Sequence, residues 1–136
     1  MNFFTFLRYN YRAILWSLVI LVLSWVPGDS IPEFSFWHLL SFDKFAHASV
    51  YGILVLLTIV GRSKQYRFSF YRSKIVFRSL IFSITYGILV EIFQAYANTG
   101  RHMEFADMIA NTIGSLLGVA AFYIIYGKAV HVREED

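Results

Sequence analysis

The sequence predicts an all-α integral membrane protein in which four helices pack as an antiparallel bundle, with both termini in the cytoplasm and a polar pocket on the extracytoplasmic side. Of the 136 residues, 57% are hydrophobic and 19% aromatic, above the roughly 45–50% apolar content of soluble domains. Four apolar runs approach the length needed to cross a bilayer, about 20 residues. Most basic residues fall at one set of expected helix ends and most acidic residues at the other.

The four predicted spans cover residues 9–26, 43–60, 75–97 and 107–126 of a single domain, residues 1–136. The first follows a short basic and aromatic segment. A cleaved signal peptide is the alternative for this segment, but no A-x-A-like cleavage site follows the apolar run. We therefore expect a retained membrane span.

Pro27 and Gly28 end the first span. Residues 33–42 are rich in aromatic side chains and are expected to form a loop at the membrane interface. Ser41 or Asp43 is the expected N-cap of the second span, because serine and aspartate accept hydrogen bonds from the free N–H groups at a helix start.

The segment 62–78, which contains the loop before the third span, carries six basic residues and no acidic one: Arg62, Lys64, Arg67, Arg72, Lys74 and Arg78. Short loops with an excess of Lys and Arg stay in the cytoplasm, so the second span ends inside and the first begins there. Binding of anionic lipid is the alternative role for this loop. Because these topology signals explain the net charge of +3, no nucleic-acid partner is expected.

This topology gathers ten polar residues toward the outer ends of the spans: Asp43, Lys44, His47, Tyr51, Glu91, Gln94, Arg101, Glu104, Asp107 and Asn111. Asp43, His47 and Tyr51 step by four along the second span, and the polar residues of the third and fourth spans also recur every three or four residues. Each of these sets therefore lies on one helix face. Glu91 is predicted to lie about 9 Å below the outer end of its helix, at 1.5 Å per residue. A charge within a span costs roughly 2.5–3.5 kcal/mol, which favours a functional role or an essential ion pair for Glu91.

Other members of this set also have a structural interpretation. His47 fits a hydrogen-bonded core histidine, Tyr51 fits ordinary packing, and Asp107 fits a favourable charge at a helix N-terminus. Gly114 and Gly118 form a small-xxx-small pair, which we assign to helix packing within the bundle.

The chain has no cysteine, which excludes disulfides, thiolate metal sites and a cysteine nucleophile. A metal site is conceivable with His47, His102, Glu104 and Asp107. No recognised spacing such as H-E-x-x-H occurs, so no metal is assigned and the cofactor is unknown. G-x-S-x-G and glycine-rich phosphate loops are also absent from the sequence.

Three motifs resemble the VanZ-like family of small bacterial membrane proteins: Asp43-Lys44-x-x-His47-x-x-x-Tyr51, Glu91-x-x-Gln94 and Arg101-x-x-Glu104-x-x-Asp107-x-x-x-Asn111-x-x-Gly114. The resemblance covers residues 42–118. It implies a four-helix protein of the bacterial cytoplasmic membrane, from a family named after a teicoplanin-resistance protein. It also implies that the residues of these motifs are characteristic of the family, but it assigns no role to any of them.

The leading hypothesis is that the polar residues bind, and in one version chemically modify, a lipid-linked or phosphate-bearing envelope molecule. Lys44 and Arg101 would neutralise phosphate, whereas Glu91, Asp107 or His47 would serve as the catalytic general base. The remaining polar residues would bind or orient the ligand: Asp43, Tyr51, Gln94, Glu104 and Asn111. The expected partners are membrane lipids and, as one candidate, a lipid-linked cell-wall precursor.

The alternative is a non-enzymatic membrane scaffold or interaction module in which a buried ion-pair network locks the helices together, since buried pairs can provide specificity rather than net stability. A transporter is a weaker third interpretation, because the sequence shows no inverted repeat and the inner halves of the spans are almost wholly apolar. Both an enzyme and a binding protein fit the residues. No oligomeric state is assigned.

Overall fold

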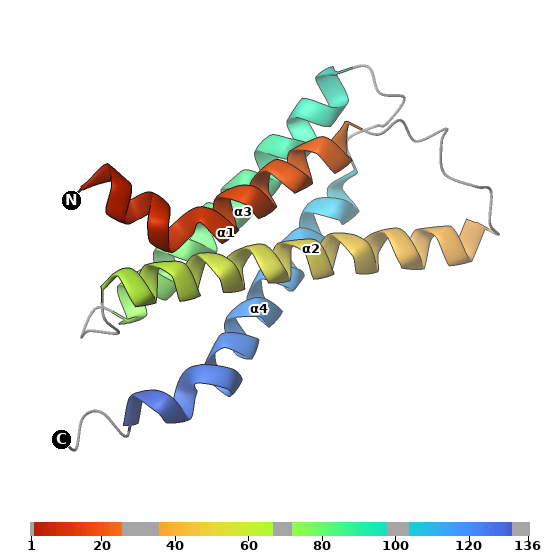
Figure 1. Ribbon diagram of the computed structural model, residues 1–136. Coiled ribbons are helices and arrows are strands. Elements are labelled where there is room, and N and C mark those ends of the chain that lie inside the picture. The colour runs from red at the N-terminus through yellow and green to blue at the C-terminus, as the bar shows by residue number, and fades with distance from the viewer. Residues whose placement is uncertain (1, 26–35, 67–71, 98–103, 132–136) are drawn as a thin grey trace.

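The computed structural model of the protein describes residues 2–25, 36–66, 72–97 and 104–131. Within these ranges the chain forms four helices, α1 (Phe3–Ser24), α2 (Phe36–Gln65), α3 (Arg72–Tyr96) and α4 (Phe105–His131) (Figure 1). Each contains a stretch long and apolar enough to cross a membrane. The predicted all-α class with four candidate spans is confirmed.

The helices extend beyond the predicted spans. α1 begins at Phe3, before the expected start near residue 9, and α4 continues to His131, into the expected tail. Hydropathy marks only the part of a helix that fits the hydrocarbon core. The backbone hydrogen bonds of a helix continue into the membrane interface until a sequence signal stops them.

The start of α2 corrects the sequence analysis most clearly. Residues 36–42 were predicted as an interfacial loop, but α2 begins at Phe36. Ser41 and Asp43 therefore lie inside the helix, and the prediction that either is its N-cap was wrong. The physical reason is that no proline or glycine occurs between Pro32 and Gly52, so nothing in the sequence interrupts the helix.

α2 and α4 cross at a contact made by small residues. A Cβ atom added at Gly114 would overlap the carbonyl group of Ala48, and one added at Gly118 would overlap the carbonyl oxygen of Gly52. The two backbones thus touch directly, as small residues permit in membrane helices. The packing role predicted for Gly114 and Gly118 is confirmed.

Two groups of buried apolar side chains join α2 to its neighbours. The first joins α2, α3 and α4 and consists of Val55, Ile59, Ile75, Val76 and Phe122. The second joins α1, α2 and α3 and consists of Ile20, Tyr51, Leu54 and Val90. α2 contributes to both groups and is therefore the central helix of the core.

Hydrogen bonds from side chains attach α1 to the core. The Trp16 indole donates to the Val50 carbonyl of α2 (3.0 Å), and the Tyr86 hydroxyl of α3 donates to the Ser17 carbonyl of α1 (2.6 Å). Without these bonds, the indole N–H of Trp16 and the hydroxyl of Tyr86 would have no hydrogen-bond partner in lipid. These bonds fix the position of α1 beside the pair α2 and α3.

Many large apolar side chains on the outside of the helices are exposed, among them Leu18, Val22, Leu89, Leu117 and Ile124. Contiguous apolar surface on this scale is rare in soluble proteins. It fits helices whose outer faces contact lipid, in agreement with the four candidate spans.

We predict that Gly114→Ala destabilises the protein by about 1–3 kcal/mol, the usual penalty for forcing extra atoms into a packed interior. The matched control is Gly127→Ala, also in α4, where nothing lies within 4 Å of the added Cβ. Thermal unfolding in detergent should show a lower midpoint for Gly114→Ala and an unchanged or higher one for the control. Equal midpoints for the two variants would contradict the close crossing.

Candidate functional site

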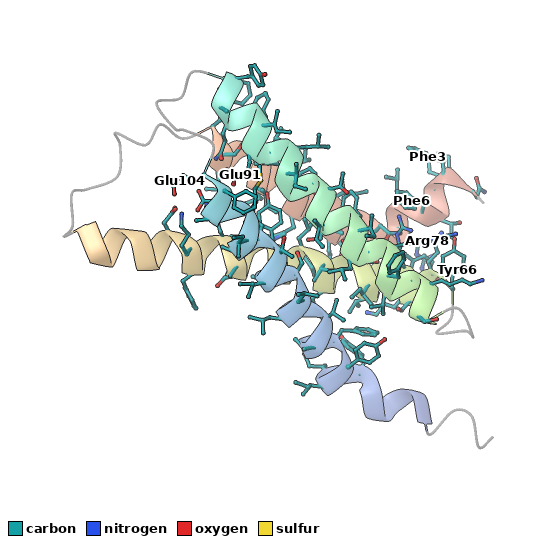
Figure 2. The ribbon with its side chains drawn as sticks, turned by 180° about the vertical axis from the view of Figure 1, so that it is seen from behind. Phe3, Phe6, Tyr66, Arg78, Glu91 and Glu104 are labelled. Atoms are coloured by element: carbon teal, nitrogen blue, oxygen red, sulfur yellow. The ribbon has the colours of Figure 1, made fainter. Side chains whose placement is uncertain are left out.

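The first half of α2, the start of α4 and the later part of α3 bring together seven polar residues, here called the polar cluster: Asp43, Lys44, His47, Glu91, Glu104, Asp107 and Asn111. Figure 2 places Glu91 and Glu104 toward the same end of the molecule, with Tyr66 and Arg78 toward the other. The helices converge here because the glycine contact at Gly114 holds α2 and α4 close together about one turn beyond Asn111.

Lys44 is surrounded by carboxylates. Its Nζ lies 2.8 Å from Glu104 Oε2 and 3.5 Å from Asp43 Oδ2, and it is paired closely with Asp107 Oδ1. The Asp107 side chain is only 10% exposed, whereas that of Glu104 is 53% exposed. Asp107 is therefore the inner partner of Lys44, and Glu104 lies at the edge of the cluster.

A second set of contacts lies deeper between α2, α3 and α4. His47 Nδ1 lies 3.0 Å from Asn111 Oδ1 and 3.6 Å from Glu91 Oε1. Asn111 Nδ2 donates to Glu91 Oε1 at 3.5 Å. Glu91, at 1% exposure, is the most buried carboxylate among the described residues. Its polar partners explain how a carboxylate is accommodated within a candidate span.

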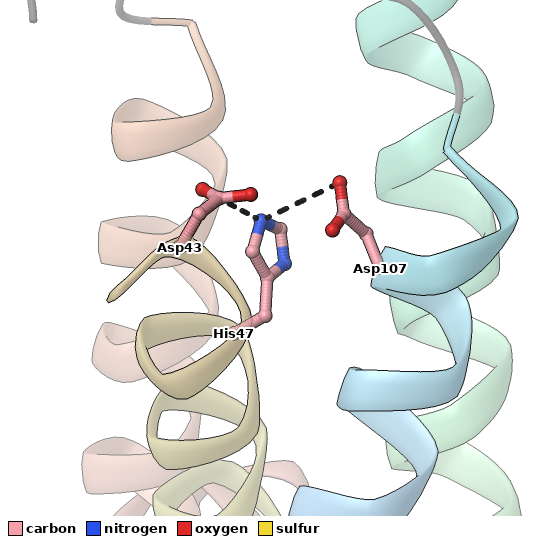
Figure 3. A group of neighbouring side chains, drawn as sticks. All are labelled: Asp43, His47 and Asp107. Atoms are coloured by element: carbon pink, nitrogen blue, oxygen red, sulfur yellow. Dashed lines mark ion pairs between the residues drawn. The ribbon is translucent and has the colours of Figure 1, made fainter. Parts of the chain in front are cut away.

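The other ring nitrogen of His47 faces the carboxylates that surround Lys44. His47 Nε2 lies 3.7 Å from Asp43 Oδ1 and 4.0 Å from Asp107 Oδ2 (Figure 3). His47 thus connects the two sets of contacts, with one nitrogen toward Asn111 and the other toward two aspartates.

Tyr51 lies below His47, four residues further along the same face of α2. Its side chain is buried, and its hydroxyl has no hydrogen-bond partner among the described residues. A Cβ added at Gly87 would lie 3.1 Å from the Tyr51 ring and 3.3 Å from Asn111 Nδ2. The absence of a side chain at Gly87 therefore makes room for Tyr51 and Asn111 beside α3.

The predicted site residues fall into three groups. The polar cluster and the adjacent Tyr51 are brought together, as the helical spacing predicted. Gln94 instead donates to the Ser24 carbonyl of α1 at 3.3 Å, a contact that joins α3 to α1. Arg101 and His102 lie outside the described residues.

The polar cluster contains more acidic than basic side chains, whereas recognition of a phosphate by Lys44 alone would require this lysine to be free of carboxylate partners. Its four acidic residues are Asp43, Glu91, Glu104 and Asp107, and its basic side chains are Lys44 and His47. The ammonium group of Lys44 is already occupied by three of these carboxylates. A phosphate would therefore need a further positive charge at this site.

The structure also shows a cavity that the sequence analysis did not predict. It has a volume of about 210 Å³ and is lined by residues from the end of α2 and the start of α3: Arg62, Tyr66, Lys74, Ile75 and Arg78. We call it the basic cavity. The sequence did carry a signal for this cavity: Arg62 and Tyr66 are four residues apart, and so are Lys74 and Arg78. Each pair therefore lies on one face of its helix.

A model of the VanZ/LLP1 family matches residues 1–126 of the chain. The chain belongs to the VanZ/LLP1 family. No curated protein and no solved structure matches it. The resemblance inferred from three motifs is confirmed, and the family match also includes α1, where those motifs have no counterpart. Family membership and four candidate spans together identify a multi-pass membrane protein.

We predict that Lys44→Met lowers the stability of this VanZ/LLP1 protein, because it leaves Asp107 and its neighbours without their cation. Removing one partner of a buried ion pair costs roughly 3–5 kcal/mol. The Lys44 side chain is 23% exposed, which places the expected loss at or below the lower end of that range.

The control for this prediction is Glu104→Gln, which removes a half-exposed partner of Lys44 and should cost about 0–1 kcal/mol. Thermal unfolding of both variants in the same detergent compares their losses of stability. If Lys44→Met were as stable as the wild type, the ion pairs of Lys44 would contribute nothing to the fold.

Proposed function

We propose that this VanZ/LLP1 protein binds a lipid-linked or phosphate-bearing molecule of the cell envelope in the polar cluster, and that the cluster opens to the extracytoplasmic side of the bacterial cytoplasmic membrane. The observation that carries the proposal is the polar cluster itself. Buried ionisable groups in membrane-spanning segments are rare, and they mark ligand or ion sites by default.

The proposed orientation places both termini in the cytoplasm and arranges the helices as an antiparallel bundle. The contacts support it: Asn10, early in α1, bonds to Gln65 at the end of α2, and Asn111, early in α4, donates to Glu91, late in α3. The basic cavity lies at the end of the molecule distant from Glu91 (Figure 2). Basic residues favour the cytoplasmic side, so the polar cluster would face outward.

A head group fits this location better than a wholly water-soluble ligand does. The polar cluster lies at the ends of candidate spans, and Lys44 and Asp107 both fall within them. A lipid in the outer leaflet presents its phosphate or sugar at about this depth, while its chains stay beside the exposed apolar faces of the helices.

Within this proposal the residues divide into two roles. Arg101 would supply positive charge to the phosphate, because Lys44 already binds carboxylates. Glu91, whose Oε1 lies 3.6 Å from His47 Nδ1, would be the base for any reaction at the head group, since proton transfer needs a group of suitable pKa within hydrogen-bond reach. If the molecule is a cell-wall precursor, the protein would also alter susceptibility to teicoplanin.

The alternative is a scaffold whose ion pairs serve only to join the helices. The observation in its favour is that Lys44 makes contacts with three carboxylates inside the protein itself. In this case loss of a cluster residue would lower stability without removing any bound molecule.

Native mass spectrometry of gently extracted protein tests the proposal. We expect a bound phospholipid or polyprenyl phosphate on the wild type and at least a tenfold lower bound fraction in Glu91→Gln and Arg101→Ala. The control is Arg78→Ala in the basic cavity, which should retain the ligand. Each lipid class is identified from its mass.

Two outcomes would contradict the proposal. A ligand lost only in Arg78→Ala would place the phosphate in the basic cavity. A ligand-free wild type with destabilised cluster variants would support the scaffold.

A further inference from the structure

We propose that Asp43, His47 and Asp107 form a binding site for a divalent cation of the Zn²⁺ or Mn²⁺ class. One ligand atom from each residue lies within 4.8 Å of the others (Figure 3). The proposal does not depend on a bound head group, because these three side chains meet within the protein itself. It differs from the sequence analysis, which assigned no metal because no recognised spacing occurs.

The hydrogen bonds of His47 prepare Nε2 to act as a ligand. Asn111 Nδ2 donates to Glu91 Oε1, which orients the amide so that its Oδ1 faces His47 Nδ1 at 3.0 Å. Nδ1 must then carry the proton and donate it, which leaves the lone pair on Nε2. Histidines that bind metals commonly donate their other N–H group to a carbonyl or carboxylate in this way.

The two aspartates divide their oxygens between Lys44 and His47. Asp43 Oδ2 and Asp107 Oδ1 contact Lys44. The remaining oxygens, Asp43 Oδ1 and Asp107 Oδ2, lie 3.7 and 4.0 Å from His47 Nε2. A lone pair and two carboxylate oxygens facing one another repel unless a positive charge lies between them.

The distances between the proposed ligand atoms suit a metal ion. With bonds of 2.0–2.1 Å in a tetrahedral site, neighbouring ligand atoms are about 3.4 Å apart. The two distances from His47 Nε2, 3.7 and 4.0 Å, exceed this value by about 0.3 and 0.6 Å, and all three ligand atoms lie within 4.8 Å of one another. One imidazole with two carboxylates is a donor set that borderline ions accept, whereas Mg²⁺ and Ca²⁺ favour oxygen ligands alone.

Tyr51, whose ring lies beside Gly87, carries a polar atom that is separate from the three proposed ligands. It is buried to 2% exposure and has no hydrogen-bond partner among the described residues. Helical side chains lean toward the N-terminal turn, so Tyr51 leans toward His47, and its ring lies beside Gly87 with Asn111 next to it. A buried polar atom without a partner is costly, and a water molecule beside Asn111 would satisfy it.

A proton on His47 Nε2 is the competing way to place positive charge among these oxygens. When all four acidic residues of the polar cluster are ionised, Lys44 leaves a net charge of minus three. A protonated His47 reduces it to minus two, and a divalent ion reduces it to minus one. The ion neutralises more of the buried charge, and it also offers a further coordination position to water or to a phosphate oxygen.

The test uses the full-length protein without a polyhistidine tag, freed of metal with a chelator and kept in a lipid-free, phosphate-free detergent buffer. Isothermal titration with Zn²⁺, Mn²⁺ and Mg²⁺ should show one Zn²⁺ or Mn²⁺ per chain and at least tenfold weaker Mg²⁺ binding. Asp43→Asn and His47→Gln should abolish this binding. Asn111→Leu, which removes the acceptor for His47, should weaken it by about 10–100-fold.

The matched control is Glu104→Gln, which removes an acid that contacts Lys44 but leaves the three proposed ligands in place. Its affinity should stay within about threefold of the wild type. Co²⁺ added to the wild type should give the visible absorption bands of a four-coordinate ion with nitrogen and oxygen ligands. Those bands should be absent in His47→Gln.

The proposal is wrong if the folded wild type binds no ion stoichiometrically, or if His47→Gln binds as tightly as the wild type. Circular dichroism and size-exclusion chromatography establish that each variant is folded. If a variant unfolds, the wild-type titration and the cobalt spectrum still decide the question. Because no lipid is present, a negative result leaves the head-group proposal to its own test.

Discussion

The direct backbone contact between α2 and α4 is the constraint on which the site depends. Gly114 lies so close to Ala48, and Gly118 so close to Gly52, that α4 has no room for a side chain at position 114 or 118. Asn111 lies about one turn before Gly114 and His47 directly precedes Ala48, so this proximity puts His47 within hydrogen-bond distance of Asn111. A wider crossing would separate the residues of the two helices, and the polar cluster would no longer be continuous.

The buried charges depend on this geometry because each needs partners from another helix. Lys44 of α2 is neutralised mainly by α4, and Glu91 of α3 is reached by His47 and Asn111 from the other two helices. Networks of this kind stabilise a membrane protein only when most members are satisfied. The Tyr51 hydroxyl, buried below His47, is the exception, because it has no hydrogen-bond partner among the described residues.

Much of the fold and site was predictable because helices impose a fixed period on their side chains. The spacing of Asp43, His47 and Tyr51 fixed their common face, and charge asymmetry suggested which ends meet. Which residues pair across helices was not predictable. The sequence does not reveal, for example, that Gln94 donates a hydrogen bond to α1. Such details depend on helix rotation and rotamers, which packing of the whole bundle determines.

Whether the polar cluster holds a phosphate-bearing head group or only joins helices can be decided in a phospholipid bilayer. Solid-state NMR of ¹⁵N-labelled protein in phospholipid bilayers tests it through dipolar coupling between the His47 ring nitrogens and lipid ³¹P. A head group in the polar cluster should give a clear coupling at His47 that disappears when Arg101→Ala removes the ligand. Absence of coupling at His47, with coupling confined to Arg62 and Arg78 of the basic cavity, would contradict it.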